Sequence, residues 1–86
     1  MPRIVLMGSI RQQAGGLDAI EVEGATVRAA VASLEKQHPA LKSWVADEQG
    51  ALRRHVKLFR GGEAVTLEAA LAPGDDLYIV GAVSGG

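Results

Sequence analysis

The residues with the clearest chemical use are Gly85 and Gly86, at the C-terminal end of the sequence. Two consecutive residues without a Cβ can enter a narrow cleft in extended form, because no side chain limits the approach of the backbone. The carboxylate of Gly86 would then reach a nucleotide phosphate and could itself be the substrate of an activating reaction. The plainer interpretation, which these two residues leave open, is a frayed terminus without a chemical role.

The other polar residues do not form a recognisable catalytic or metal-binding set. His38 and His55 fall in different parts of the chain and show no ligand spacing, so we expect no metal site. Asp75 and Asp76 are adjacent and are typical of a turn rather than of a paired acid and base. No motif combines a nucleophile, a base and an electrostatic stabiliser, and we therefore expect no enzyme.

Length and composition describe one small globular domain. The chain has 86 residues, of which 48% are apolar and 22% are charged, so it can bury one modest core. The absence of cysteine excludes a disulfide scaffold. A net charge of −1 and a shortage of aromatic residues argue against a nucleic-acid partner. The longest apolar run, residues 4–7, is too short to span a membrane, and no cationic leader precedes it. We therefore expect a cytoplasmic protein with no membrane partner.

Hydrophobic spacing predicts one main helix and several strands. Thr26 is a suitable N-cap, and apolar residues recur after it at helical intervals, which predicts a helix over residues 26–37. Residues 9–17 are expected to form a polar connection, and residues 68–71 a single helical turn. Strands are predicted at residues 4–7, 18–23, 54–60, 64–67 and 77–80.

The order of these elements predicts an α+β roll. Two strand pairs flank the helix, which can cover one face of a single sheet. We expect a mixed sheet of four to five strands with one main helix on one face. Residues 1–82 are assigned to this domain and residues 83–86 to a flexible tail.

Alternation along the strands predicts an apolar surface on the sheet face away from the helix. Six apolar residues share one parity and are expected to face the helix: Ile4, Leu6, Val56, Leu58, Leu77 and Ile79. The opposite parity presents an apolar patch, which usually marks a partner surface unless loops cover it. This expected partner surface consists of Val5, Met7, Phe59, Tyr78 and Val80. Positive charge near it, for steering or as a solvated basic edge, would come from Arg53, Arg54, Lys57 and Arg60.

The C-terminal part of the sequence resembles a known family. A Gly-Asp turn at residues 73–76, an apolar strand at residues 77–80 and a small-residue tail at residues 82–86 follow one another. This order resembles the ubiquitin-like sulfur carriers related to the molybdopterin synthase small subunit and the thiamine sulfur carrier. Residues 14–16 and the expected elements at 26–37 and 52–58 also fall where that family has counterparts. The likeness is greatest to its longer members, including the carrier for cysteine biosynthesis.

The resemblance implies a β-grasp, ubiquitin-like fold and the role of a protein cosubstrate, or of the small subunit of a sulfur-transfer complex. In that family, an adenylating enzyme of the ubiquitin-activating type uses Mg-ATP to form an acyl-adenylate on the terminal carboxylate. Sulfide displaces AMP and leaves a thiocarboxylate, which a sulfur-accepting synthase consumes. No cofactor is bound by the carrier. Carried to this sequence, Gly86 bears the sulfur, Gly85 provides access, and Ser84 and Val83 line the partner's channel.

One departure leaves the recipient pathway open. Many molybdopterin-type carriers have prolines just before the tail, where this chain has Gly81-Ala82. Two other functions fit the same residues. A ubiquitin-like modifier would join the activated terminus to a lysine of another protein, and a β-grasp binding module would use the sheet and have an inert tail.

Overall fold

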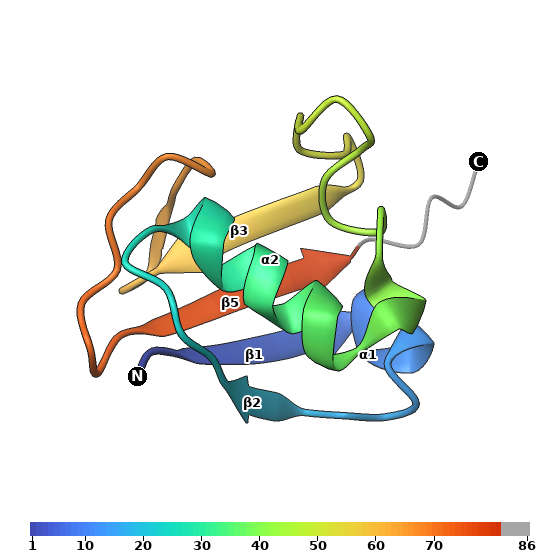
Figure 1. Ribbon diagram of the computed structural model, residues 1–86, viewed down its shortest axis with the longest axis horizontal. Helices are drawn as coiled ribbons and strands as arrows, with labels where there is room; N and C mark the ends of the chain where they lie inside the picture. The colour runs from blue at the N-terminus through green and yellow to red at the C-terminus, as the bar shows by residue number, and fades with distance from the viewer. Residues whose placement is uncertain (82–86) are drawn as a thin grey trace.

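The computed structural model describes residues 1–81, which form one five-stranded sheet with a helix across one face (Figure 1). The strand order is β2-β1-β5-β3-β4, so the first and last strands lie side by side within the sheet. The predicted α+β roll with a mixed sheet and one main helix is confirmed. The strands are β1 (Arg3–Gly8), β2 (Ala19–Glu21), β3 (Val56–Arg60), β4 (Glu63–Ala64) and β5 (Asp76–Gly81). The helices are α1 (Ser9–Gln13), α2 (Val27–Gln37) and the 3₁₀ helix η1 (Pro39–Leu41).

The pairing of β1 with β5 is parallel, whereas the other strand pairs are antiparallel. Ile4 pairs with Leu77 and Leu6 with Ile79, and Ile79 pairs in turn with Leu58 of β3. The register therefore aligns buried residues in rows across three strands. Because the two central strands run the same way, both end at the same edge of the sheet.

The core lies between these rows and α2. The six residues that alternation assigned to the helix-facing side are all buried, none exposing more than 2% of its surface. The helix contributes four buried residues, spaced as the sequence predicted. The predicted division of the sheet into a buried and an exposed face is therefore confirmed. The buried helix residues are Val27, Ala30, Val31 and Leu34.

The start of α2 is held by a side chain and by a distant segment. The Thr26 hydroxyl accepts a hydrogen bond from the Ala29 amide at 3.1 Å, as expected of an N-cap. The amides of Val27 and Arg28 donate to the carbonyls of Ala69 and Leu67. The helical turn expected at residues 68–71 is therefore wrong. This segment instead satisfies the free N–H groups of the first turn of α2.

The polar connection expected at residues 9–17 is also wrong, because its first half forms α1. Ile10 is fully buried in this helix. Five residues with one buried side chain give too short a pattern for helical spacing to be detected. Most predicted strands are shorter in the structure, and the strand expected at residues 64–67 is reduced to Glu63–Ala64. The turn between β3 and β4 falls at Gly61-Gly62, with φ of 59° and 83° at the two glycines.

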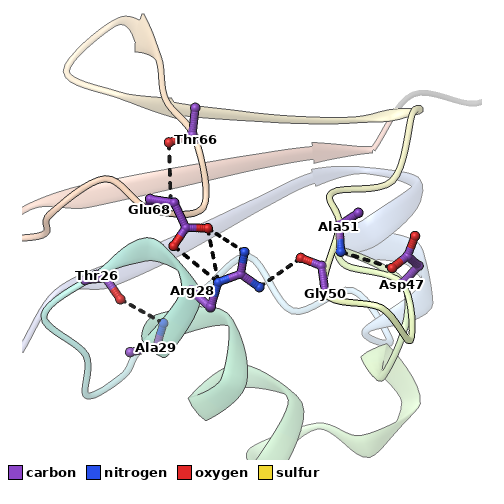
Figure 2. A network of polar contacts seen from close by, with 8 residues as sticks. All are labelled: Thr26, Arg28, Ala29, Asp47, Gly50, Ala51, Thr66 and Glu68. Atoms are coloured by element: carbon purple, nitrogen blue, oxygen red, sulfur yellow. Dashed lines mark hydrogen bonds and ion pairs between the residues drawn. The ribbon is translucent and has the colours of Figure 1, made fainter.

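Arg28 connects α2 to two other segments (Figure 2). Its Nη2 lies 2.5 Å from Oε1 of Glu68, and its Nη1 donates to the Gly50 carbonyl at 2.8 Å. Within the same loop, Oδ1 of Asp47 accepts hydrogen bonds from the amides of Gln49 and Ala51 at 2.9 and 3.0 Å. These contacts hold the segments around residues 47–51 and 67–69 against α2.

The stability of this network is expected to depend on pH. The hydrogen bond from Arg28 lowers the pKa of Glu68, and that from the Ala51 amide lowers the pKa of Asp47. A carboxylate with a lowered pKa in the folded state stabilises the fold fully above its ordinary pKa. That contribution is lost as the pH falls through the pKa that the carboxyl group has in the folded state. Urea unfolding should therefore show a free energy of unfolding that declines below about pH 4.

The double variant Asp47→Asn/Glu68→Gln should flatten this decline, because it removes both titrating groups. Glu48→Gln is the matched control, since Glu48 is an exposed neighbour in the same loop. An unchanged slope in the double variant would contradict the assignment.

Candidate functional site

The sheet face opposite α2 carries the five residues predicted as a partner surface. Val5 and Phe59 both pair with Tyr78, and Met7 pairs with Val80, so side chains of three strands lie next to one another. Met7 is 45% exposed and Tyr78 37%, while the other three are half-buried. We call these five residues the open face.

The apolar rows continue beyond the open face and end in charged residues. Ala19 pairs with Val5, and Ala64 pairs with Phe59, so one small or apolar row crosses all five strands. At the end where β5 begins, Arg3 forms a double hydrogen bond with Asp76, with distances of 3.1 and 2.9 Å. An exposed apolar patch with a polar rim is typical of a surface that binds a partner protein.

The opposite end of the sheet is where β5 ends, at Gly81. Gly81 pairs with Gly8 of β1 and with Val56 of β3. Gly8 has φ of 71°, and a Cβ there would overlap the Gly81 carbonyl oxygen. A Cβ at Gly81 would lie 2.7 Å from Cγ1 of Ile10, well inside van der Waals contact. Only glycine fits at either position, so the last described residue has a fixed place beside β1 and α1.

The predicted reactive residues lie outside the described part of the chain. These are Val83, Ser84, Gly85 and Gly86. The structure does give the point from which they continue, next to Met7 and Val80 on the open face. The role of Gly8 and Gly81 was not predicted from the sequence. The available signal was that each glycine ends an apolar strand, but their contact depends on the register between the two strands.

Three of the four predicted steering cations lie at this same end. Arg53 and Arg54 lie three and two residues before β3, and Lys57 pairs with Val80. Arg60 does not join them, because it pairs with Leu77 near the start of β5 and donates a hydrogen bond from Nη1 to the Ala70 carbonyl. The predicted basic group is therefore smaller than the sequence suggested.

The remaining candidates have structural positions. Oδ2 of Asp75 accepts a hydrogen bond from the Ala72 amide at 2.8 Å, which confirms the predicted turn. His38 caps the C-terminal end of α2, whereas His55 lies before β3. Within residues 1–81, no group of three His, Cys, Asp or Glu residues could hold a metal ion. No helix in that part of the chain has the length and hydropathy to cross a membrane.

A mixed five-stranded sheet with one main helix on a single face defines the β-grasp, ubiquitin-like class of small proteins. Residues 4–86 match the ThiS family, and the chain belongs to that family. The predicted resemblance to ubiquitin-like sulfur carriers is thereby confirmed.

Relatives with solved structures cover nearly the whole chain. Small archaeal modifier protein 1 of Haloferax volcanii is 44% identical over 68 residues, 78% of each protein. The crystal structure of that protein, SAMP1, has a TM-score of 0.83 at 38% identity and covers 99% of this chain and 98% of its own. The structure of the BexX/CysO complex of Amycolatopsis orientalis contains a chain with a TM-score of 0.85 at 30% identity, with both chains fully covered. The relatives are small ubiquitin-like modifiers and carriers, not catalytic enzymes.

Substitutions on the two sheet faces should have opposite effects on stability. Tyr78→Asp should leave the thermal unfolding temperature near that of the unchanged protein, because this side chain is 37% exposed. Ile79→Ala, the neighbour on the buried face, should cost about 2–5 kcal/mol as a core truncation. Thermal and urea unfolding of both variants measure the difference. Equal destabilisation would show that Tyr78 belongs to the core and would remove the open face as a candidate surface.

Proposed function

We propose that this protein is a sulfur carrier whose C-terminal Gly86 is activated as an acyl-adenylate and converted to a thiocarboxylate. The sulfur would then pass to a biosynthetic pathway of the molybdopterin or cysteine type. The observation that carries the proposal is the position of the end of β5. It lies at the edge of an exposed apolar face, and the chain continues from there to Gly85-Gly86.

The proposed chemistry takes place on the carboxylate and requires no catalytic group from this chain. A carboxylate oxygen of Gly86 attacks the α-phosphorus of ATP bound with Mg²⁺ in a ubiquitin-activating-type enzyme, and pyrophosphate leaves. Sulfide attacks the acyl carbon and expels AMP. The net change is the replacement of one carboxylate oxygen by sulfur. The protein is therefore a cosubstrate, and the sulfur-accepting synthase is its second partner.

The described residues contribute recognition and placement. The open face offers apolar side chains from three strands to the adenylating enzyme, and Gly8 and Gly81 fix the point at which the tail begins. Gly85 lets the terminus enter a narrow site, and Val83 and Ser84 line the partner's channel. The similarity to CysO, which was solved in a complex with BexX, supports a function that depends on a partner protein.

A second function uses the same terminus. The 44% identity to small archaeal modifier protein 1 favours a modifier that joins Gly86 to a lysine of another protein through an isopeptide bond. In that case the lysine amine, rather than sulfide, would displace AMP. Conjugates of higher mass that contain this chain in cells would support the modifier function.

Intact mass measurement tests the carrier proposal. The untagged protein is incubated with the cognate adenylating enzyme, Mg-ATP and a sulfide source. We expect a mass gain equal to the exchange of one oxygen for sulfur, located at Gly86 by fragmentation. The protein with one residue appended after Gly86 is the control and should show no gain. An unchanged mass, with proven binding and ATP turnover, would contradict the proposal.

A further inference from the structure

A pocket of about 330 Å³ lies in the segment that connects η1 to β3. We call it the basic pocket. Its lining contains two cationic side chains, one histidine and the indole of Trp44, and no carboxylate. Neither the open face nor the C-terminal chemistry makes use of it. The lining residues are Lys42, Ser43, Trp44, Arg53 and His55.

The wall of the basic pocket is held in an uncommon backbone conformation. Within residues 1–81, Ser43 is the one non-glycine residue with positive φ, at 67°. Arg53 donates from Nε to the Ser43 carbonyl, and the Ser43 amide donates to Oε2 of Glu35 at 3.4 Å. In these contacts Arg53 uses one edge of its guanidinium. The two η nitrogens of Arg53 form no hydrogen bond with the described residues.

The chemistry of the lining fits a carboxylate. A guanidinium presents paired N–H donors that match the two oxygens of a carboxylate, and Lys42 adds a second positive charge. Trp44 is half-buried against the core and supplies an apolar wall, along which the methylene groups of an acidic side chain can pack. The pocket therefore suits a Glu or Asp side chain of another protein.

The basic pocket lies at the end of the sheet from which the tail continues. Arg53 and His55 come just before Val56, which pairs with Gly81, the last residue of β5. The ion pairs of the described residues involve Arg3, Arg11 and Arg28. The cations around the pocket are not among them. Arg53 also interacts electrostatically with Asp47 and contributes to the lowered pKa of that carboxyl, whereas the charges of Lys42 and Arg54 remain available to a partner that approaches this end.

We propose that the basic pocket receives a carboxylate side chain of the adenylating enzyme, as a second docking point beside the open face. The proposal rests on the proposed function for the identity of the partner. An apolar face alone can hold the carrier against the enzyme, but it does not fix how the carrier is rotated on the enzyme surface. A charge contact near the end of β5 fixes that rotation, and it accelerates encounter by electrostatic attraction.

Charge reversal with a matched control tests the docking point. Lys42 and Arg54 are exposed, form no described hydrogen bond through their side chains and border the pocket region. We expect Lys42→Glu/Arg54→Glu to slow association with the adenylating enzyme by about tenfold or more at low salt. The salt dependence of the association rate should also weaken. Lys36→Glu, at an exposed position on α2, is the control and should change the rate less than twofold.

A direct readout comes from Trp44, because the chain contains a single tryptophan. Biosynthetic 5-fluorotryptophan then places one fluorine beside the basic pocket. Addition of the unlabelled adenylating enzyme should move its ¹⁹F resonance in the unchanged protein and move it much less in Lys42→Glu/Arg54→Glu. Mg-ATP alone should leave the resonance in place.

The possible results separate this proposal from the proposed function. A normal thiocarboxylate yield, with equal association rates for the double variant and Lys36→Glu, would overturn the docking point and leave the carrier function intact. A shift caused by Mg-ATP alone would assign the pocket to a nucleotide and would also overturn it. A third result is slower association of the double variant and a moved ¹⁹F resonance in the unchanged protein, but no thiocarboxylate. That result would support the docking point and contradict the carrier function. Absence of binding would overturn both.

Discussion

The parallel pairing of β1 with β5 is the interaction on which the rest of this structure depends. It brings the first and last strands together in the interior of the sheet, where Ile4 and Leu77 are fully buried. It also makes both strands end at one edge, where a Cβ at Gly8 would overlap the Gly81 carbonyl and a Cβ at Gly81 would overlap α1. The segment that follows Gly81 therefore continues from a point set by the core. A shift in this register would move that point and turn buried side chains toward solvent.

The same pairing separates stability from recognition. With one main helix, the chain covers one face of the sheet, and Leu58 and Ile79 are packed beneath α2. The other side of the same strands presents Tyr78 and Met7 to solvent. Alternate residues of β5 thus support the fold and form part of the proposed partner surface. The chain belongs to the ThiS family, and its relatives are small carriers and modifiers rather than catalytic enzymes.

Much of this arrangement could be predicted from the sequence, because the main strands and α2 carry strong local patterns. Period-two alternation at residues 77–80 separated the buried face from the open face, and helical spacing after Thr26 located α2. The wrong or missing predictions concern elements whose structure depends on segments distant in the sequence. Residues 67–71 pair with the start of α2, and α1 depends on the burial of Ile10 alone. The contact between the strand-end glycines and the conformation of Ser43 also depend on distant segments, which local patterns do not encode.

In the proposed function the folded sheet, rather than the tail alone, delivers the terminus to its partner. The most direct test compares pyrophosphate release by the proposed adenylating enzyme with two substrates at equal concentration. One is the full chain, and the other is a synthetic peptide with the sequence of residues 82–86. We expect release with the full chain and none above background with the peptide. Equal release with the peptide would show that the sheet is dispensable and would contradict its proposed role.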